Sequence, residues 1–167
     1  ERGKTRKVQV AFYGGSFTGL SATRQEELLG ATTSFLEQGR VHSLRLSTRP
    51  DYINPEKVER LQRYQVATVE LGVQSMDDCV LAQAKRGHTS ADVVRAVAFL
   101  KRAGLEVGIQ LLLGLPGDNR KKLAQTVAQV IKLQPDFVRI YPLLVLRNSA
   151  LAELYKIGQY QPLSLAK

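Results

Sequence analysis

Small and hydroxyl-bearing residues follow the first apolar run of the sequence. Gly14 and Gly15 precede two hydroxyl side chains, Ser16 and Thr18, in the segment GGSFT. Paired glycines let a backbone approach a ligand closely and expose its amide and carbonyl groups, to which the hydroxyls add further donors and acceptors. A Gly-Gly turn alone is more often only a turn, so other residues must decide whether a ligand binds here.

Charged and amide side chains also lie inside apolar runs. Glu70, Gly72 and Gln74 alternate along VELGVQS, so they share one face of a strand, and Gln110 lies among apolar neighbours. Burying an unpaired charge is prohibitively costly, so Glu70 must be paired or solvated. A structural ion pair and a ligand-lined interior both satisfy that demand, and the ligand-lined interior is the simpler explanation.

Two further segments carry cationic side chains. Arg49 and Asp51 flank a proline in STRPDY, where they either shape the loop through a local salt bridge or contribute to a site. Arg86, in KRGHT, can supply a cationic partner at the same edge as the acidic strand. His88 follows it, and a lone histidine is more often a structural hydrogen-bonding group than a catalyst.

Apolar, β-branched runs alternate with amphipathic segments along the chain, which predicts an α/β fold with parallel strands. The expected strands are 8–13, 43–48, 67–73, 106–113 and 137–142. The expected helices are 23–38, 55–64, 76–84, 90–102, 119–133 and 149–157. The alternation fits either an open, doubly wound sheet or part of a (β/α)₈ barrel, and both place ligands at the carboxyl ends of the strands.

Composition fits one globular domain. The chain has 167 residues, of which 44% are hydrophobic and 23% charged. We expect a single core over 1–167, with a basic lead-in at 1–6, strand–helix units at 7–157 and a tail at 158–167. No run of about 18 apolar residues and no signal-like segment occurs, so we expect a cytoplasmic protein without a membrane partner.

The charge and cysteine content bear on partners. Twenty-four Lys and Arg against fifteen Asp and Glu give a formal net charge of +9, which favours polyanions such as RNA. Because these charges are scattered, a solvated basic surface explains them equally well. The single cysteine, Cys79, excludes an internal disulfide.

Six ordered motifs resemble those of radical S-adenosylmethionine (SAM) enzymes. They are GGSFT, STRPDY, VELGVQS, KRGHT, GLPGD and YPLLVLR, and the resemblance covers Val8 to Leu165. It is strongest to the SAM domain of the Elongator catalytic subunit and its bacterial relatives, with oxygen-independent coproporphyrinogen III oxidase more distant. The resemblance implies a partial parallel (β/α) barrel of the radical SAM type, with five βα units in this chain.

The resemblance also implies which residues bind SAM. Four residues of the GGSFT segment, Gly14, Gly15, Ser16 and Thr18, would hold the methionyl amino and carboxylate groups. Gln74 and Arg86 would contact the ribose and the carboxylate, and Gln110 with the GLP segment would help to seat the ribose and adenine. Ser47 occupies a position at which the resembled enzymes often carry glutamate. Tyr141 begins an apolar segment at the end of the last strand, which would suit one face of a planar base. The expected cofactor-binding residues are Gly14, Gly15, Ser16, Thr18, Ser47, Gln74, Arg86, Gln110 and Tyr141.

One departure from the family concerns its metal. Radical SAM enzymes ligate a 4Fe-4S cluster through a CxxxCxxC motif, which this sequence lacks, and Cys79 alone cannot replace it. We therefore expect the first barrel strand and its cluster loop to precede Glu1. Three functions follow from the sequence: a radical SAM enzyme that modifies RNA or tRNA, a coproporphyrinogen-type oxidase, and a non-catalytic SAM- or nucleotide-binding module.

Overall fold

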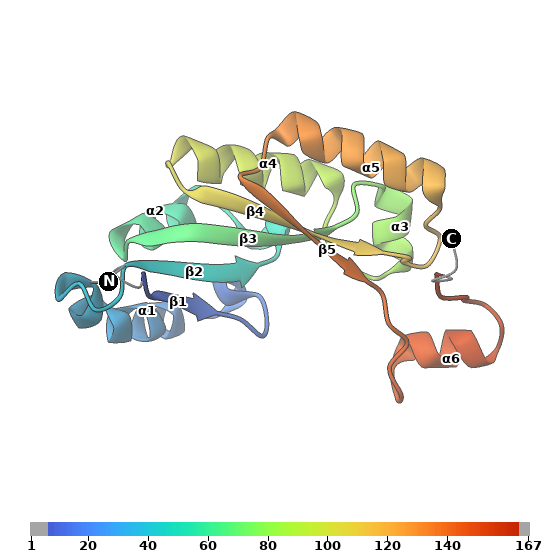
Figure 1. The fold of residues 1–167 in the computed structure, drawn as a ribbon, viewed down its shortest axis with the longest axis horizontal. Helices are drawn as coiled ribbons and strands as arrows, with labels where there is room; N and C mark the ends of the chain where they lie inside the picture. The colour runs from blue at the N-terminus through green and yellow to red at the C-terminus, as the bar shows by residue number, and fades with distance from the viewer. Residues whose placement is uncertain (1–6, 164–167) are drawn as a thin grey trace, which may run out of the picture.

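A curved sheet of parallel strands forms the centre of the computed structural model, which describes residues 7–163 (Figure 1). The strands pair in the order β1-β2-β3-β4-β5, which is also their order along the chain. They span Gln9–Phe12 (β1), Ser43–Thr48 (β2), Val66–Gln74 (β3), Glu106–Leu113 (β4) and Phe137–Pro142 (β5). The predicted partial parallel barrel is thereby confirmed.

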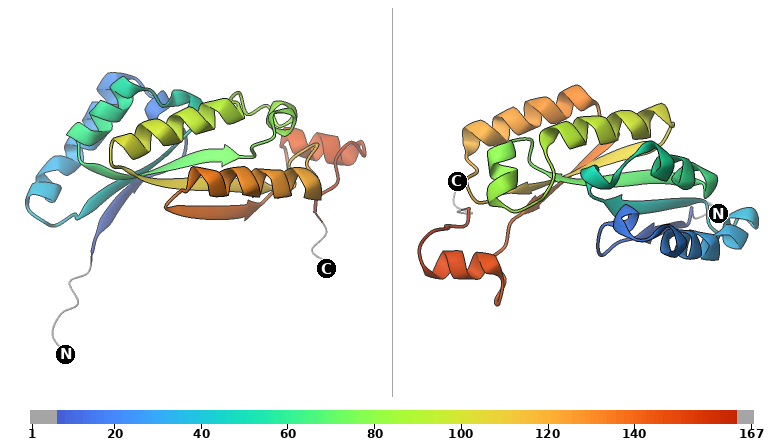
Figure 2. Two further views of the ribbon diagram at one scale, coloured as in Figure 1. Left: turned by 90° about the horizontal axis from the view of Figure 1, so that it is seen from above. Right: turned by 180° about the vertical axis from the view of Figure 1, so that it is seen from behind.

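The helices span Ala22–Glu37 (α1), Pro55–Arg63 (α2), Asp78–Gln83 (α3), Ser90–Arg102 (α4), Arg120–Leu133 (α5) and Ala150–Lys156 (α6). Helices α1 to α5 connect successive strands and gather on one side of the sheet, whereas α6 follows the last strand and lies beyond the end of the sheet (Figure 2). Two short 3₁₀ turns, Phe17–Gly19 (η1) and Pro50–Tyr52 (η2), follow β1 and β2. Within residues 7–163, no helix is both long and apolar enough to cross a bilayer.

The helix starts follow local side-chain chemistry. Each of the six helices begins after a residue whose side chain accepts a hydrogen bond from a backbone N–H three positions later, which satisfies a donor that the helix itself leaves unpaired. These N-cap residues are Ser21, Asn54, Asp77, Thr89, Asn119 and Ser149. Because Asp77 is the cap, α3 begins at Asp78 and not at the expected residue 76.

Alternation along the strands divides the sheet into two chemically different faces. Leu44, Leu46, Val69, Leu71 and Ile109 are completely buried in the hydrophobic core beneath the helices. Each such side chain stabilises the fold by roughly 1.5–3 kcal/mol through removal of apolar surface from water. The intervening residues lie on the concave face.

The concave face is polar at its centre. Strand register aligns Ser47 with Glu70 and Gln110 with Arg139, so their side chains emerge on the same side. The ladder between β3 and β4 is irregular between Leu71 and Gln74, where Gln74 has a φ of +69°. The fold thus brings polar side chains from several strands together at the carboxyl ends.

Candidate functional site

A cavity of about 350 Å³ opens at the carboxyl ends of β2, β3 and β4, where the loops after β1 and α3 also meet. Its lining residues are Gly15, Ser16, Ser47, Thr48, Arg49, Gly72, Gln74, Lys85, Arg86 and Gln110. Six of the nine residues predicted to bind a cofactor are among them. Segments far apart in the sequence therefore build one concave site, as the parallel topology requires.

The other three predicted residues lie elsewhere. Thr18 is completely buried, and its hydroxyl is hydrogen-bonded to that of Thr48 at 2.6 Å. Gly14, with a φ of +100°, lines a neighbouring pocket, and Tyr141 on β5 is 40% exposed and lies outside the cavity lining. Gly14 and Thr18 accordingly shape the loop that carries Gly15 and Ser16.

Arg86 lines the cavity and carries an unpaired polar atom. Its Nε atom is buried and has no hydrogen-bond partner among the described residues. Burial lowers the pKa of Arg86, and the nearby positive charge of Arg49 lowers it further. The two acidic residues near it in sequence are used elsewhere, because Asp77 accepts from the Val80 N–H and Asp78 from the Ser90 N–H. The guanidinium group is thus available to an anionic ligand.

Arg49 holds the adjacent loop in place. Its Nε and Nη2 atoms donate to the two carboxylate oxygens of Asp51 at 3.0 and 2.7 Å, and its guanidinium group lies 4.9 Å from the centre of the Tyr52 ring. The hydrogen bonds to Asp51 raise the pKa of Arg49. A Cβ atom on Gly87 would come within 2.7 Å of Arg49 Nη2, so this glycine lets the KRGHT loop pack against the STRPDY loop.

His88 has a structural contact. Its Nε2 atom lies 3.0 Å from the carbonyl oxygen of Val73, and because a carbonyl only accepts, Nε2 carries the proton and donates. The ring is buried, which lowers its pKa, while the hydrogen bond to Val73 opposes that shift. This agrees with the expectation that His88 is a hydrogen-bonding group of the scaffold.

Ser47 and Gly72 contribute to the cavity wall in different ways. The Ser47 hydroxyl is buried and has no partner among the described residues. A Cβ atom on Gly72 would lie 3.1 Å from Gln74 Nε2 and 3.8 Å from Arg86 Nη2, so a side chain there would enter the cavity. Glycine at this position keeps the space between Gln74 and Arg86 clear.

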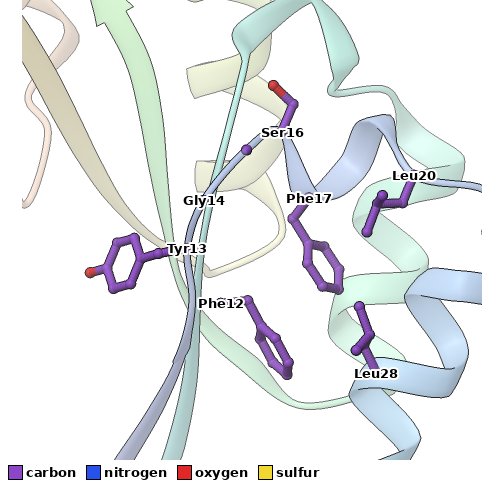
Figure 3. Close-up of a pocket in the computed structure, with 8 residues that line it drawn as sticks. Phe12, Tyr13, Gly14, Ser16, Phe17, Leu20 and Leu28 are labelled. Atoms are coloured by element: carbon purple, nitrogen blue, oxygen red, sulfur yellow. The ribbon is translucent and has the colours of Figure 1, made fainter.

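A second pocket, of about 280 Å³, lies beside the first strand and was not predicted (Figure 3). Phe12, Phe17 and Leu28 point into it, whereas Tyr13 points to the other side of the strand (Figure 3). The Phe12 and Phe17 ring centres are 5.2 Å apart. The aromatic residues on both sides of the GGS segment were the available signal, but they are equally typical of an ordinary core.

The donor set fits SAM but not an iron–sulfur cluster. Arg86 offers a planar fork for a carboxylate, the amides of Gln74 and Gln110 suit hydroxyl and amino groups, and the buried Ser47 hydroxyl lacks a partner. No group of three His, Cys, Asp or Glu side chains that could hold a metal exists within residues 7–163. Cys79 is exposed and lies outside the cavity lining.

Family models cover nearly the whole chain. Residues 1–130 match the Radical SAM superfamily, and residues 135–167 match the Radical_SAM C-terminal domain. The chain belongs to the radical SAM superfamily. The resemblance drawn from the six sequence motifs is thereby confirmed.

Individual relatives agree with this family. Sequence identity is 32% to the tRNA uridine(34) acetyltransferase of Methanocaldococcus jannaschii, over 95% of this chain and 33% of that protein. It is 27% to Elongator complex protein 3 of Saccharomyces cerevisiae, over 95% of this chain and 32% of that protein. This radical SAM chain therefore spans about a third of the length of these curated relatives.

Solved structures give the same fold. The Elp3 protein of the archaeon Methanocaldococcus infernus superposes with a TM-score of 0.81 at 29% identity, over 94% of this chain and 42% of that one. Coproporphyrinogen III oxidase of Escherichia coli superposes with a TM-score of 0.68 at 21% identity, over 81% of this chain and 32% of that one. The second likeness concerns the radical SAM fold alone.

Proposed function

We propose that this chain is the SAM-binding half-barrel of a radical SAM enzyme that modifies RNA, with tRNA as its substrate class. The observation that carries the proposal is the cavity at the carboxyl ends of the strands, where Arg86 Nε and Ser47 Oγ are buried without partners among the described residues and Gly72 keeps the space clear. Unpaired buried polar groups are costly, and a rotation of the Arg86 and Ser47 side chains toward the cavity would let a polar ligand pair with them.

Each lining group would have a definite task. Arg86 would bind the methionyl carboxylate through a charge-assisted contact, and the loop at Gly15 and Ser16 would hold the methionyl end. Gln74 would contact the ribose, whose hydroxyls suit an amide. Bound SAM supplies the 5′-deoxyadenosyl group on which the chemistry of this superfamily depends. The described residues offer no ligand set for the cluster.

RNA is the substrate class that charge and similarity favour. The chain carries a formal net charge of +9, which attracts phosphate groups. The Methanocaldococcus jannaschii relative acts, by its name, on uridine 34 of tRNA. An RNA substrate agrees with both observations.

Equilibrium dialysis of the 167-residue chain with radiolabelled SAM tests the cofactor. We expect a dissociation constant between high micromolar and millimolar, or about 4–6 kcal/mol, because few charged contacts are available. Gly72→Val should abolish this binding by placing methyl groups between Gln74 and Arg86. Ala67→Val, an exposed position on the same strand, is the matched control and should bind normally. Absence of binding by the wild type, or normal binding by Gly72→Val, would contradict the proposal.

Titration with a tRNA at several salt concentrations tests the substrate class. Binding through phosphates releases counterions, so log K should fall against log salt concentration with a slope of about −2 or steeper. SAM binding, measured in the same buffers, should have a much smaller slope and serves as the control. A tRNA slope near zero would remove RNA as the partner.

A further inference from the structure

Glu70 joins all five strands at the centre of the concave face. Its side chain is completely buried and accepts hydrogen bonds from Tyr13 Oη at 2.9 Å and Arg45 Nη1 at 3.0 Å, both at Oε1. At Oε2 it accepts from Gln110 Nε2 at 2.7 Å, and Arg139 Nε lies 3.3 Å away. These partners come from the end of β1 and from β2, β4 and β5.

The carboxylate determines which way the Gln110 amide faces. Arg45 and Arg139 can only donate, so the Glu70 oxygens act as acceptors, and Gln110 must turn its NH₂ group toward them. The amide carbonyl oxygen then faces away from Glu70. Gln110 lines the cavity, and within residues 7–163 its Oε1 atom accepts no hydrogen bond.

An acceptor here complements the three cationic side chains of the cavity wall. Arg49, Lys85 and Arg86, which also line the cavity, offer only donors. SAM carries donors of its own in the ribose hydroxyls, the adenine amino group and the methionyl ammonium. A fixed carbonyl oxygen would bind one of these donors without any reorientation of the side chain, which lowers the entropic cost of binding.

We propose that Glu70 is a positioning residue, which holds the Gln110 carbonyl oxygen as a hydrogen-bond acceptor for SAM. The proposal rests on the proposed function, because SAM is the ligand that the acceptor serves. Glu70 does not line the cavity and acts only through Gln110. A purely structural Glu70 would instead affect stability and leave SAM affinity unchanged.

Exchange of the two side chains separates these roles. In Glu70→Gln, the new amide keeps a carbonyl oxygen for Arg45 and Tyr13 and presents NH₂ to Gln110 and Arg139. This orientation is favoured because the Arg139 side chain is 39% exposed and can turn to solvent, whereas that of Arg45 is 19% exposed. Gln110 must then turn its own oxygen inward and its NH₂ group toward the ligand. The Gln110 NH₂ group would then face a donor of SAM, and the hydrogen bond between them would be lost. We expect SAM binding to weaken about tenfold, which is within the range for the loss of one buried hydrogen bond.

The double variant Glu70→Gln/Gln110→Glu restores the hydrogen bond between the two positions, with the donor now at position 70 and the acceptor at position 110. The amide introduced at position 70 donates to one oxygen of the carboxylate introduced at position 110. The other carboxylate oxygen remains an acceptor for the ligand, and the net charge equals that of the wild type. SAM affinity should return to within about threefold of the wild-type value. Tyr13→Phe is the control, because it removes another donor to Glu70 without touching Gln110, and it should bind SAM normally.

Side-chain amide NMR of the ligand-free protein provides a second readout. The Gln110 amide protons, assigned by their loss in Gln110→Leu, should exchange slowly in the wild type and faster in Glu70→Gln. Equal SAM affinity in wild type and Glu70→Gln, failure of the double variant to recover, or a freely exchanging Gln110 amide would each overturn the inference. A wild type that binds no SAM while its Gln110 amide exchanges slowly overturns the proposed function and, with it, the ligand named here.

Discussion

Thr18 and Thr48 share a hydrogen bond of 2.6 Å between their hydroxyl groups, and both side chains are buried. The Thr18 N–H also donates to Thr48 Oγ1 at 3.3 Å. The pair fastens the loop after β1 to the end of β2. It thereby holds Gly15 and Ser16 at the cavity.

Thr18→Val tests this anchoring. Valine has nearly the same shape but removes a hydroxyl from a buried pair, so the free energy of unfolding should fall by about 1–3 kcal/mol in a urea titration. Thr33→Val, on the partly exposed face of α1, is the control and should change stability by less than about 0.5 kcal/mol. Unchanged stability of Thr18→Val would show that the loop is held by other contacts.

Thr126 makes an analogous connection between α5 and the end of β3. Its hydroxyl accepts a hydrogen bond from the Met76 N–H at 3.1 Å and lies 3.3 Å from Ser75 Oγ. Thr126→Val would leave a buried backbone donor unpaired, so we expect a loss of about 1–3 kcal/mol in the free energy of unfolding. Thermal and urea unfolding measure it, and a loss below about 0.5 kcal/mol would contradict the assignment.

The fold could be predicted because its determinants are local. Apolar runs of period two and helix-capping residues recur along the chain, and the observed strands fall within two residues of those expected. β3 extends to Gln74, where a φ of +69° ends the strand in a conformation that a residue-type pattern does not encode. The residue types also left the start of α3 open, because either Ser75 or Asp77 could have served as its N-cap. The structure uses Asp77.

The site could be predicted only in part because its contacts are long-range. The sequence indicated that Glu70 needs a partner, but its donors lie 25 to 69 positions away and are brought together only by strand register. Thr18 illustrates the same limit: its hydroxyl turns inward because Thr48, 30 positions later, meets it. The SAM contacts of the six cavity-lining residues stay predictions.

The lowered pKa of His88 implies that the free energy of unfolding depends on pH. Burial lowers its pKa below the ordinary value of 6.5, so the folded state favours the neutral ring. Above about pH 6.5 both states are neutral and the contribution to stability is complete; as the pH falls below that value, the unfolded state takes up the proton first and stability is lost. Urea titrations at about pH 7.5 and about pH 5, on either side of that value, measure the loss.

A variant isolates the contribution of this histidine. His88→Gln retains a donor for the Val73 carbonyl but does not titrate, so its loss of stability between about pH 7.5 and about pH 5 should be smaller than that of the wild type. If His88→Gln loses as much stability as the wild type, the buried ring does not carry the pH dependence.

Arg86 is the sharpest probe of the cavity as a SAM site. Lysine keeps the positive charge but lacks the planar fork, so Arg86→Lys should weaken SAM binding by roughly 1–3 kcal/mol, or about fivefold to 150-fold in Kd. The melting temperature should change little, because Arg86 makes no ion pair with the described residues that the substitution could break. Arg24→Lys, at an exposed position of α1, is the matched control and should change neither quantity. Equilibrium dialysis and thermal unfolding of the same samples separate the two roles: a lowered melting temperature with unchanged SAM affinity would make Arg86 part of the scaffold and assign the methionyl carboxylate to another group.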